Sequence, residues 1–284
     1  MQNVDDDEFV KESADIYSHD SLPLSMNWTN FNGFNWISPV KNQASCGSCV
    51  AFAAIATLEG TLNIAAYNPA LNLDLSEQYL FSNIGYCNFG AWPSSAMSSL
   101  KKEGVPDESC FPYISGREGE DFSSSLACKD VNTRQYKIKE YSYYTKVADI
   151  KAALTRAPLL TTMSVYEDFM FYGGGIYKHV AGSLMGGHAV TIVGYDDTIN
   201  AWIGKNSWGT VWGEDGYFKI AYDDTSSFAS YAYEVKVDIP DIKIILDSPQ
   251  YLDAVKDNLN IKVNKNYNNS EISSLKYLLI NKDE

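Results

Sequence analysis

The stretch that begins at Cys49 constrains the fold of this chain most strongly. It is rich in alanine, and its apolar residues recur at intervals of three and four, the spacing expected of a buried helix. The predicted helix covers Cys49 and the run 50–59, which places Cys49 in the first turn. The unpaired N–H groups and positive dipole end of a helix N-terminus stabilise a thiolate, the form in which cysteine is a nucleophile.

A histidine and an asparagine far downstream are candidate partners of this thiol. His188 stands just before the β-branched run 189–195, which is bounded by glycines and is typical of a core strand. Asn206 follows a second apolar segment, 201–204, across a predicted turn. In such a hairpin the amide can hydrogen-bond the imidazole and fix its orientation, while the imidazole takes the proton of the thiol.

Several short motifs are distributed along the chain, and three of them contain Cys49, His188 and Asn206. In chain order they are Pro39-Val40-Lys41-Asn42-Gln43, Cys46-Gly47-Ser48-Cys49, Leu75-Ser76-Glu77-Gln78, Cys110-Phe111-Pro112-Tyr113, Gly187-His188-Ala189, Lys205-Asn206-Ser207-Trp208-Gly209 and Trp212-Gly213-Glu214-Asp215-Gly216-Tyr217. With these motifs in this order, the sequence from about Leu22 to Val237 resembles the papain-like cysteine peptidases.

The resemblance implies roles for four residues. Cys49 is then the nucleophile, His188 the general acid and base, and Asn206 the residue that orients the imidazole. The Gln43 side chain and the Cys49 backbone N–H then form the oxyanion hole, in which each donor contributes about 3 to 4 kcal/mol by analogy with measured hydrolases. The implied function is that of a cysteine-type endopeptidase, which needs no cofactor and no metal ion.

The resemblance also implies a substrate cleft. The backbone of Gly90 is expected to pair with the substrate, and Trp208 to shield the hydrogen bond between the histidine and the asparagine. Residues 228–231 are expected to close the floor of the main pocket. Its uncharged walls predict a preference for an apolar or aromatic side chain, and they are Trp92, Pro93, Thr162 and Gly187.

The sequence departs from the family pattern beside the nucleophile. Val50 occupies the position after Cys49 where the family usually has tryptophan, and Ala44 stands where glycine is common. These departures leave one alternative open, a non-catalytic binding or adhesion protein that uses the same fold.

The five cysteines suggest two disulfides and one free thiol. The resemblance implies that Cys46 pairs with Cys87 and Cys110 with Cys128, so that Cys49 is free. Structural disulfides indicate an oxidising compartment, and we expect a secreted, extracellular or lysosome-like location. Five reduced cysteines in a cytosolic protein are the alternative.

The predicted elements define an α+β fold. The resemblance implies the two-lobe papain-like form, with a helical N-terminal lobe, an antiparallel β-barrel-like C-terminal lobe and the active-site cleft between them. Helices are expected from Cys49, after Ser76, over 93–103 with a stop at Gly104, and over 147–156, with strands from Tyr136 onwards.

The chain is expected to divide into three regions. Residues 1–20 are expected to be a lead-in or propeptide remnant, and 21–240 the peptidase domain, with a helical lobe over about 21–130 and a β lobe over 131–240. Residues 241–284 are expected to be a β-rich extension, interpreted as part of a truncated β-sandwich module. The alternative is that they add edge strands to the peptidase.

Composition limits the partners. A net charge of −14 and a pI near 4.6 argue against nucleic acid and anionic membranes as partners. The sequence has no apolar run of membrane-spanning length. We expect a monomer that acts on proteins or peptides, with an inhibitory prodomain outside this chain as a further partner.

Overall fold

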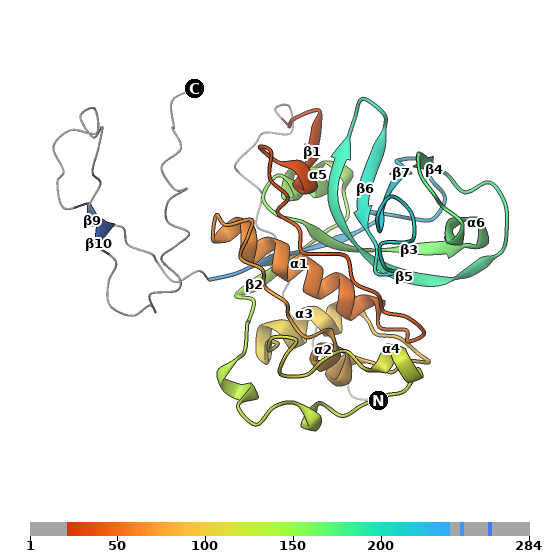
Figure 1. Ribbon diagram of the computed structural model, residues 1–284. Coiled ribbons are helices and arrows are strands. Elements are labelled where there is room, and N and C mark those ends of the chain that lie inside the picture. Colours follow the sequence, from red (N-terminus) through yellow and green to blue (C-terminus); the bar gives the residue numbers. More distant parts are fainter. Residues whose placement is uncertain (1–21, 239–244, 247–260, 263–284) are drawn as a thin grey trace, which may run out of the picture.

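The computed structural model describes residues 22–238, 245–246 and 261–262. In Figure 1, α1 runs between a group of helices and a twisted sheet. The helices are α1 (Cys49–Ala65), α2 (Glu77–Ile84), α3 (Pro93–Lys102), α4 (Ser115–Glu118), α5 (Val147–Leu154) and α6 (Glu167–Met170), with 3-10 turns η2 (Trp28–Asn30), η3 (Ser124–Leu126) and η4 (Val131–Thr133). The strands are β1 (Ser25–Asn27), β2 (Glu140–Tyr144), β3 (Leu159–Tyr166), β4 (Ile176–Tyr177), β5 (Leu184–Asp196), β6 (Ala201–Lys205), β7 (Tyr217–Ala221), β8 (Ala232–Lys236), β9 (Ile245–Leu246) and β10 (Ile261–Lys262).

Helix α1 is buried along most of its length because it contacts both layers. It packs against α2 and α3 on one side and against β5 and β3 on the other. Short side chains make this possible: a Cβ at Gly60 would lie 2.7 Å from Pro158 Cγ. The predicted helix is confirmed and continues to Ala65.

Helices α2 and α3 begin at the predicted signals. The Oγ of Ser76 accepts a hydrogen bond from the N–H of Tyr79 at 3.0 Å, which caps α2. Pro93 is the first residue of α3, and Gly104 follows its end with φ +81°. Local sequence signals therefore predicted these helices correctly.

The sheet is mixed and open. Within the described residues its strand order is β2-β8-β3-β5-β6-β7-β4, with β1 paired to β5. All neighbours are antiparallel except β4 and β7, which are parallel. The α+β two-lobe fold is confirmed, but the barrel-like, antiparallel description needs correction: β2 and β4 are edges of the described sheet and do not pair with each other.

Strands β5 and β6 form the predicted hairpin. Thr191 lies opposite Lys205 at the end of β6, and the register shifts between Ile192 and Gly194. Gly194 of β5 also pairs with Asn27 of β1, and a Cβ at Gly194 would lie 2.2 Å from the carbonyl oxygen of Met26. This close approach lets the N-terminal segment pack against the sheet.

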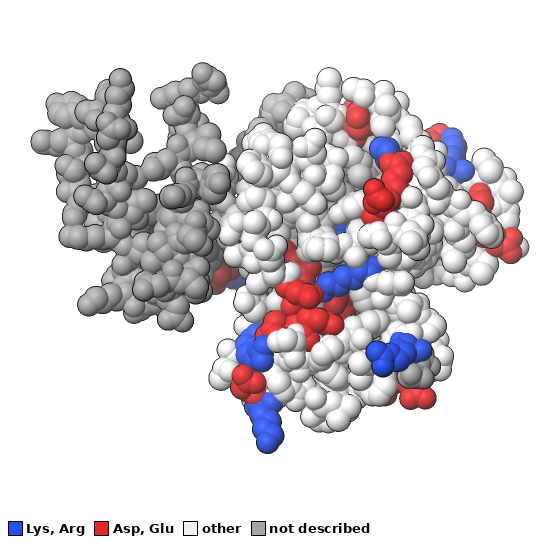
Figure 2. Space-filling view, in the orientation of Figure 1, with Lys and Arg blue, Asp and Glu red and all other residues white. Residues whose placement is uncertain are grey.

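The described chain has two hydrophobic clusters, and each contains residues that are far apart in the sequence. Met26 and Trp28, from the N-terminal segment, pack in the cluster of the β lobe. Leu160 and Ala189, from the sheet, pack in the cluster around α1. Figure 2 shows that, on this face, charged side chains gather most densely where the helical layer meets the sheet.

The expectations for 1–20 and for most of 241–284 fall outside the described residues. In the latter region β9 and β10 pair antiparallel, with Ile261 opposite Leu246.

Candidate active site

Cys49 is the first residue of α1 and lines a cleft of about 920 Å³ between the lobes. It is the free cysteine of the described chain. The other four cysteines form the Cys46–Cys87 and Cys110–Cys128 disulfides. The candidate nucleophile therefore lies where the start of the helix meets the cleft.

The Cys46–Cys87 disulfide joins the loop before the nucleophile to the loop that carries Gly90. Gly47 N–H donates to the carbonyl oxygen of Cys87 at 3.0 Å, and a Cβ on Gly47 would lie 2.6 Å from that oxygen. Glycine is required here by the close approach of the two backbones. Gly90, with φ +73°, lines the cleft beside this contact.

The hairpin brings His188 and Asn206 together. His188 Nε2 donates to Asn206 Oδ1 at 2.8 Å, and the same oxygen accepts the N–H of Ser207 at 2.8 Å. These two donors orient the amide with its oxygen toward the ring. Trp208 stacks on the imidazole with 4.8 Å between ring centroids. The proton therefore lies on Nε2, and Nδ1 is the ring nitrogen left to accept a proton.

Burial acts on both members of the Cys49–His188 pair. It raises the pKa of the Cys49 thiol, although the backbone N–H groups of Ala189 and Val50 act in the opposite direction. Burial lowers the pKa of His188 to about 4, and the hydrogen bond with Asn206 opposes this shift. Each group alone thus favours its neutral form. A charged pair has to be stabilised by the attraction between thiolate and imidazolium, which acts only when the proton has moved between them.

Gln43 is buried, lines the same cleft as Cys49, and has an amide of defined orientation. Its Oε1 accepts a hydrogen bond from Ser207 Oγ at 2.6 Å, and its Nε2 donates to the carbonyl oxygen of Cys46 at 3.0 Å. The second N–H of Nε2 remains available to the cleft, which Gln43 lines together with Cys49. Ser207, which fixes this orientation, was missed as a functional residue although it lies inside a recognised motif.

The expected pocket residues all line the cleft, but they differ in how deeply they are buried. Trp92 is 78% exposed and lies on its rim, whereas Pro93 is buried. Thr162 Oγ1 donates to the hydroxyl of Tyr231 at 2.8 Å, and Tyr231 lines the same cleft. Phe228, from the segment expected at the floor, instead packs in the core of the β lobe.

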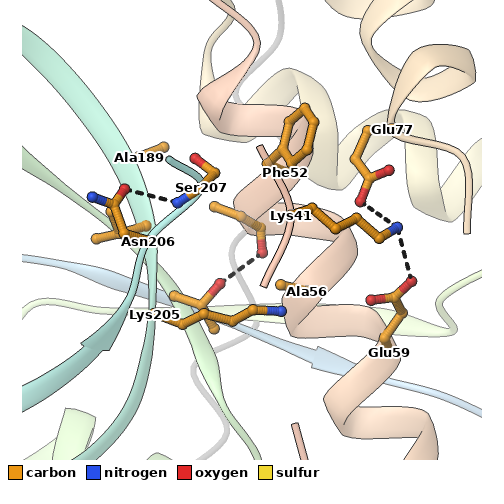
Figure 3. A pocket seen from close by; sticks show the side chains of 12 residues that line it. Lys41, Phe52, Ala56, Glu59, Glu77, Ala189, Lys205, Asn206 and Ser207 are labelled. Atoms are coloured by element: carbon orange, nitrogen blue, oxygen red, sulfur yellow. Dashed lines mark hydrogen bonds and ion pairs between the residues drawn. The ribbon is translucent and has the colours of Figure 1, made fainter. Parts of the chain in front are cut away.

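A cluster of charged side chains that includes the buried Glu59 and Glu77 was missed in the sequence. The Nζ of Lys41 forms ion pairs with Asp74 at 2.6 Å, Glu77 at 2.8 Å and Glu59 at 3.6 Å. Figure 3 shows Lys205 reaching toward this cluster from the strand side. Burial raises the pKa of Glu77, although the ion pair with Lys41 opposes this shift, and burial lowers the pKa of Lys205 to about 8. The available signal was that Lys41, Glu77 and Lys205 lie inside the motifs quoted above.

Two classes of site are not found in the described chain. Residues 22–238 and the two short strands contain no group of three His, Cys, Asp or Glu side chains that could hold a metal ion. No helix in the same part of the chain is long and apolar enough to cross a membrane.

A thiol at a helix N-terminus and an imidazole held by an amide, both lining a cleft between two lobes, form an arrangement typical of cysteine hydrolases. Residues 22–236 match the family model described as papain family cysteine protease. The chain belongs to this family.

Individual curated relatives support this family assignment. The chain is similar to cathepsin B-like CP3 of Giardia intestinalis, with 38% identity over 198 residues that cover 65% of this chain and 64% of that protein. It is similar to fruit bromelain of Ananas comosus, with 31% identity over 222 residues that cover 76% of this chain and 59% of that protein. The chain thus spans less than two thirds of the length of these relatives.

Solved structures share the fold. Bromelain from Ananas comosus, solved with the inhibitor E64, aligns with a TM-score of 0.62 and 29% identity over 76% of this chain and all of that chain. Xylellain, a cysteine protease from Xylella fastidiosa, aligns with a TM-score of 0.67 and 25% identity over 84% of this chain and 95% of that one.

Proposed function

We propose that this protein is a cysteine-type endopeptidase that hydrolyses peptide bonds through an acyl-enzyme. The observation that carries the proposal is the oriented imidazole: His188 Nε2 is bonded to Asn206 Oδ1 at 2.8 Å, in the cleft that Cys49 lines. Family membership and the intact set of four candidate residues support it.

The proposed reaction has two halves. The Cys49 thiolate attacks the carbonyl carbon, a C–S bond forms, and the carbonyl electron pair moves to the oxygen. The Gln43 Nε2–H and the Cys49 backbone N–H stabilise that oxyanion. As the C–N bond breaks, the His188 imidazolium gives its proton to the leaving amine. His188 then takes a proton from water, the hydroxide attacks the thioester, and the carboxylate product leaves as the thiolate is restored.

We propose that the main pocket prefers an apolar or aromatic side chain at the second position on the amino side of the scissile bond. The described residues that line the cleft include no Asp, Glu, Lys or Arg. Pro93, Thr162 and Gly187 then form the walls, and Tyr231 the floor. A pocket of this kind discriminates by about 1 to 3 kcal/mol for each methylene-scale change.

The two disulfides support an oxidising working environment, secreted, extracellular or lysosome-like. We propose that the protein acts as a monomer on protein or peptide substrates, and that an inhibitory prodomain outside this chain controls it. We also propose the division into a helical lobe before about residue 130, a β lobe to 240 and a β-rich extension beyond.

The test combines covalent labelling with cleavage. Under reducing conditions an epoxysuccinyl peptide should label one equivalent of protein at Cys49, since thiolate attack opens the epoxide. Reporter peptides with phenylalanine or leucine at the second position should be cleaved at least tenfold faster than the aspartate analogue. The Cys49→Ser variant is the control, because it keeps the shape of the side chain but should lose labelling and cleavage.

Absence of both labelling and cleavage in a folded protein would contradict the proposal and favour a binding or adhesion protein on the same fold. Cleavage with a preference for aspartate would contradict only the proposed pocket.

A further inference from the structure

A single phenol hydroxyl lies between the two halves of the candidate oxyanion hole. The hydroxyl of Tyr113 donates to the carbonyl oxygen of Gln43 at 2.8 Å, and the Ser48 hydroxyl lies 2.6 Å from it. Because the phenol proton is used on Gln43, Ser48 is the donor in the second bond. Gln43 carries one oxyanion donor, and Ser48 immediately precedes Cys49, whose backbone N–H is the other.

We propose that Tyr113 is a positioning residue that holds these two oxyanion donors at a fixed separation. The inference rests on the proposed function and extends it to a residue outside the cleft, since Tyr113 acts through Gln43 and Ser48 and does not line the cleft.

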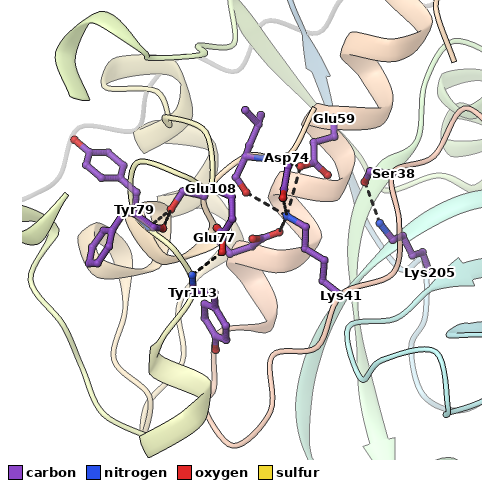
Figure 4. A network of polar contacts seen from close by, with 12 residues as sticks. Ser38, Lys41, Glu59, Asp74, Glu77, Tyr79, Glu108, Tyr113 and Lys205 are labelled. Carbon is purple, nitrogen blue, oxygen red and sulfur yellow. Dashed lines mark hydrogen bonds and ion pairs between the residues drawn. The ribbon is translucent and has the colours of Figure 1, made fainter. Parts of the chain in front are cut away.

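The ring of Tyr113 is itself held in place. It packs edge-on against Phe52 of α1, with 4.8 Å between ring centroids and 90° between the planes. Its backbone N–H donates to Glu108 Oε1 at 2.6 Å (Figure 4). Gln78 Oε1 accepts the next two backbone N–H groups, of residues 114 and 115, at 2.9 Å each. Burial raises the pKa of Tyr113 to about 12, so the hydroxyl remains a donor near neutral pH.

The loop that Tyr113 braces is under backbone strain. Ala44, directly after Gln43, has φ +50°, a left-handed conformation that costs energy for a residue with a Cβ. The backbone N–H of Gln43 donates to the carbonyl oxygen of Ser207 at 2.9 Å from one side. On the other side, Tyr113 holds the carbonyl oxygen of Gln43, and Ser45 Oγ donates to the carbonyl oxygen of Gly116 at 2.9 Å. The Tyr113 bond is the one that acts on Gln43 itself, so its loss allows the strained backbone to relax there and move the amide.

The test is Tyr113→Phe, which removes only the hydroxyl. We expect kcat for a reporter peptide to fall roughly 5- to 50-fold, less than the 10²- to 10³-fold typical of deleting a donor, with KM changed less than about twofold. The affinity for a peptide aldehyde, whose adduct places an oxyanion in the hole, should fall by a similar factor. The rate of alkylation by iodoacetamide should stay within about twofold, because that reaction needs the thiolate but no oxyanion hole.

Two variants serve as controls. Tyr195→Phe removes another phenol that donates to a backbone carbonyl, that of Pro23 at 2.8 Å, and should leave kcat unchanged. Ser48→Ala removes the second bond to Tyr113, together with a long 3.5 Å contact to the carbonyl oxygen of Cys46, and should lower kcat about threefold with normal alkylation. This variant keeps the inference testable if Tyr113→Phe does not fold.

Coupling to Gln43 completes the test. In a Gln43→Ala background, Tyr113→Phe should lower kcat less than threefold, because an absent donor cannot be misplaced. Additive effects, an equal loss in alkylation rate, or an unchanged kcat would each overturn the inference. If the wild-type protein cleaves peptides, such a result leaves the proposed function intact; a wild-type protein that neither cleaves nor is labelled overturns both.

Discussion

Partly buried residues outside the candidate catalytic pair also have shifted pKa values, and Glu108 is one of them. Burial raises the pKa of Glu108 to about 7, although the backbone N–H of Tyr113 opposes the shift. The second carboxyl oxygen, Oε2, is buried with no hydrogen-bond partner within the described chain. Between its ordinary value of 4.5 and about 7, the folded state keeps a proton that the unfolded chain has released. Stability therefore falls as the pH rises through this window.

Glu108→Gln tests this residue-scale effect. The amide keeps an acceptor for Tyr113 N–H but does not ionise, so the variant should gain stability relative to wild type as the pH rises from 4.5 to 7.5. We expect a relative gain on the order of 1 kcal/mol, since partial exposure of the site to solvent reduces the full linkage value.

Urea denaturation at several pH values measures the stability of Glu108→Gln relative to wild type. Glu103→Gln, which changes an exposed side chain, is the control. Parallel pH profiles for wild type and Glu108→Gln would contradict the prediction.

At the scale of single residues, sequence motifs identify the residues of a site but not the hydrogen bonds between them. The motifs nominate Cys49, His188 and Gln43, but they do not state which atoms meet. Ser207 Oγ reaches Gln43 Oε1 across 164 residues of sequence, and Tyr231 reaches Thr162 across 69. No local pattern encodes such contacts, because they exist only after two distant segments have packed together.

Strands β6 and β7 illustrate the constraints within an element. Gly204 of β6 lies under the ring of Phe218 on β7, and a Cβ there would approach the ring carbons to 2.3 Å. Phe218 is fully buried in the cluster of the β lobe, so the ring has little room to move. A short residue in an otherwise β-branched and aromatic hairpin thus allows a large ring to fill the core.

Gly204→Ala should therefore destabilise the protein by about 1 to 3 kcal/mol, the usual cost of overpacking. Thermal unfolding measures the change. Gly173→Ala is the matched control: a Cβ there would meet no atom within 4 Å, and the variant should unfold within a degree or two of wild type. Equal unfolding temperatures for both variants would show that the ring can shift to accommodate a methyl group.

At the scale of the whole molecule, buried charges lie where the lobes meet. Lys41 is held against Glu59 and Glu77, whose side chains are 1% and 3% exposed. Burial opposes the charged form of Lys41, but these carboxylates raise its pKa above the ordinary value. The lysine therefore compensates acidic groups that would otherwise be buried without a counter-charge.

Lys41→Met should destabilise the fold by roughly 3 kcal/mol at pH 7, because it leaves buried carboxylates uncompensated. Chemical denaturation at pH 7 measures the loss.

The control is Lys178→Met, which breaks an exposed pair with Asp223 and should leave the stability close to that of wild type. A loss from Lys41→Met as small as that from the control would mean that the cluster contributes little to stability.

The sequence by itself determined the helices that begin at Cys49, Glu77 and Pro93, the hairpin of β5 and β6, and membership of the papain family. These follow from periodicity, caps, turns and motifs, whose causes act within a few residues. Only the tertiary structure decided that the sheet is open and mixed, that β1 joins β5, and that Tyr113 lies between Gln43 and Ser48. Such features depend on which distant segments pack together, and their energy is set by burial and contact across the whole chain.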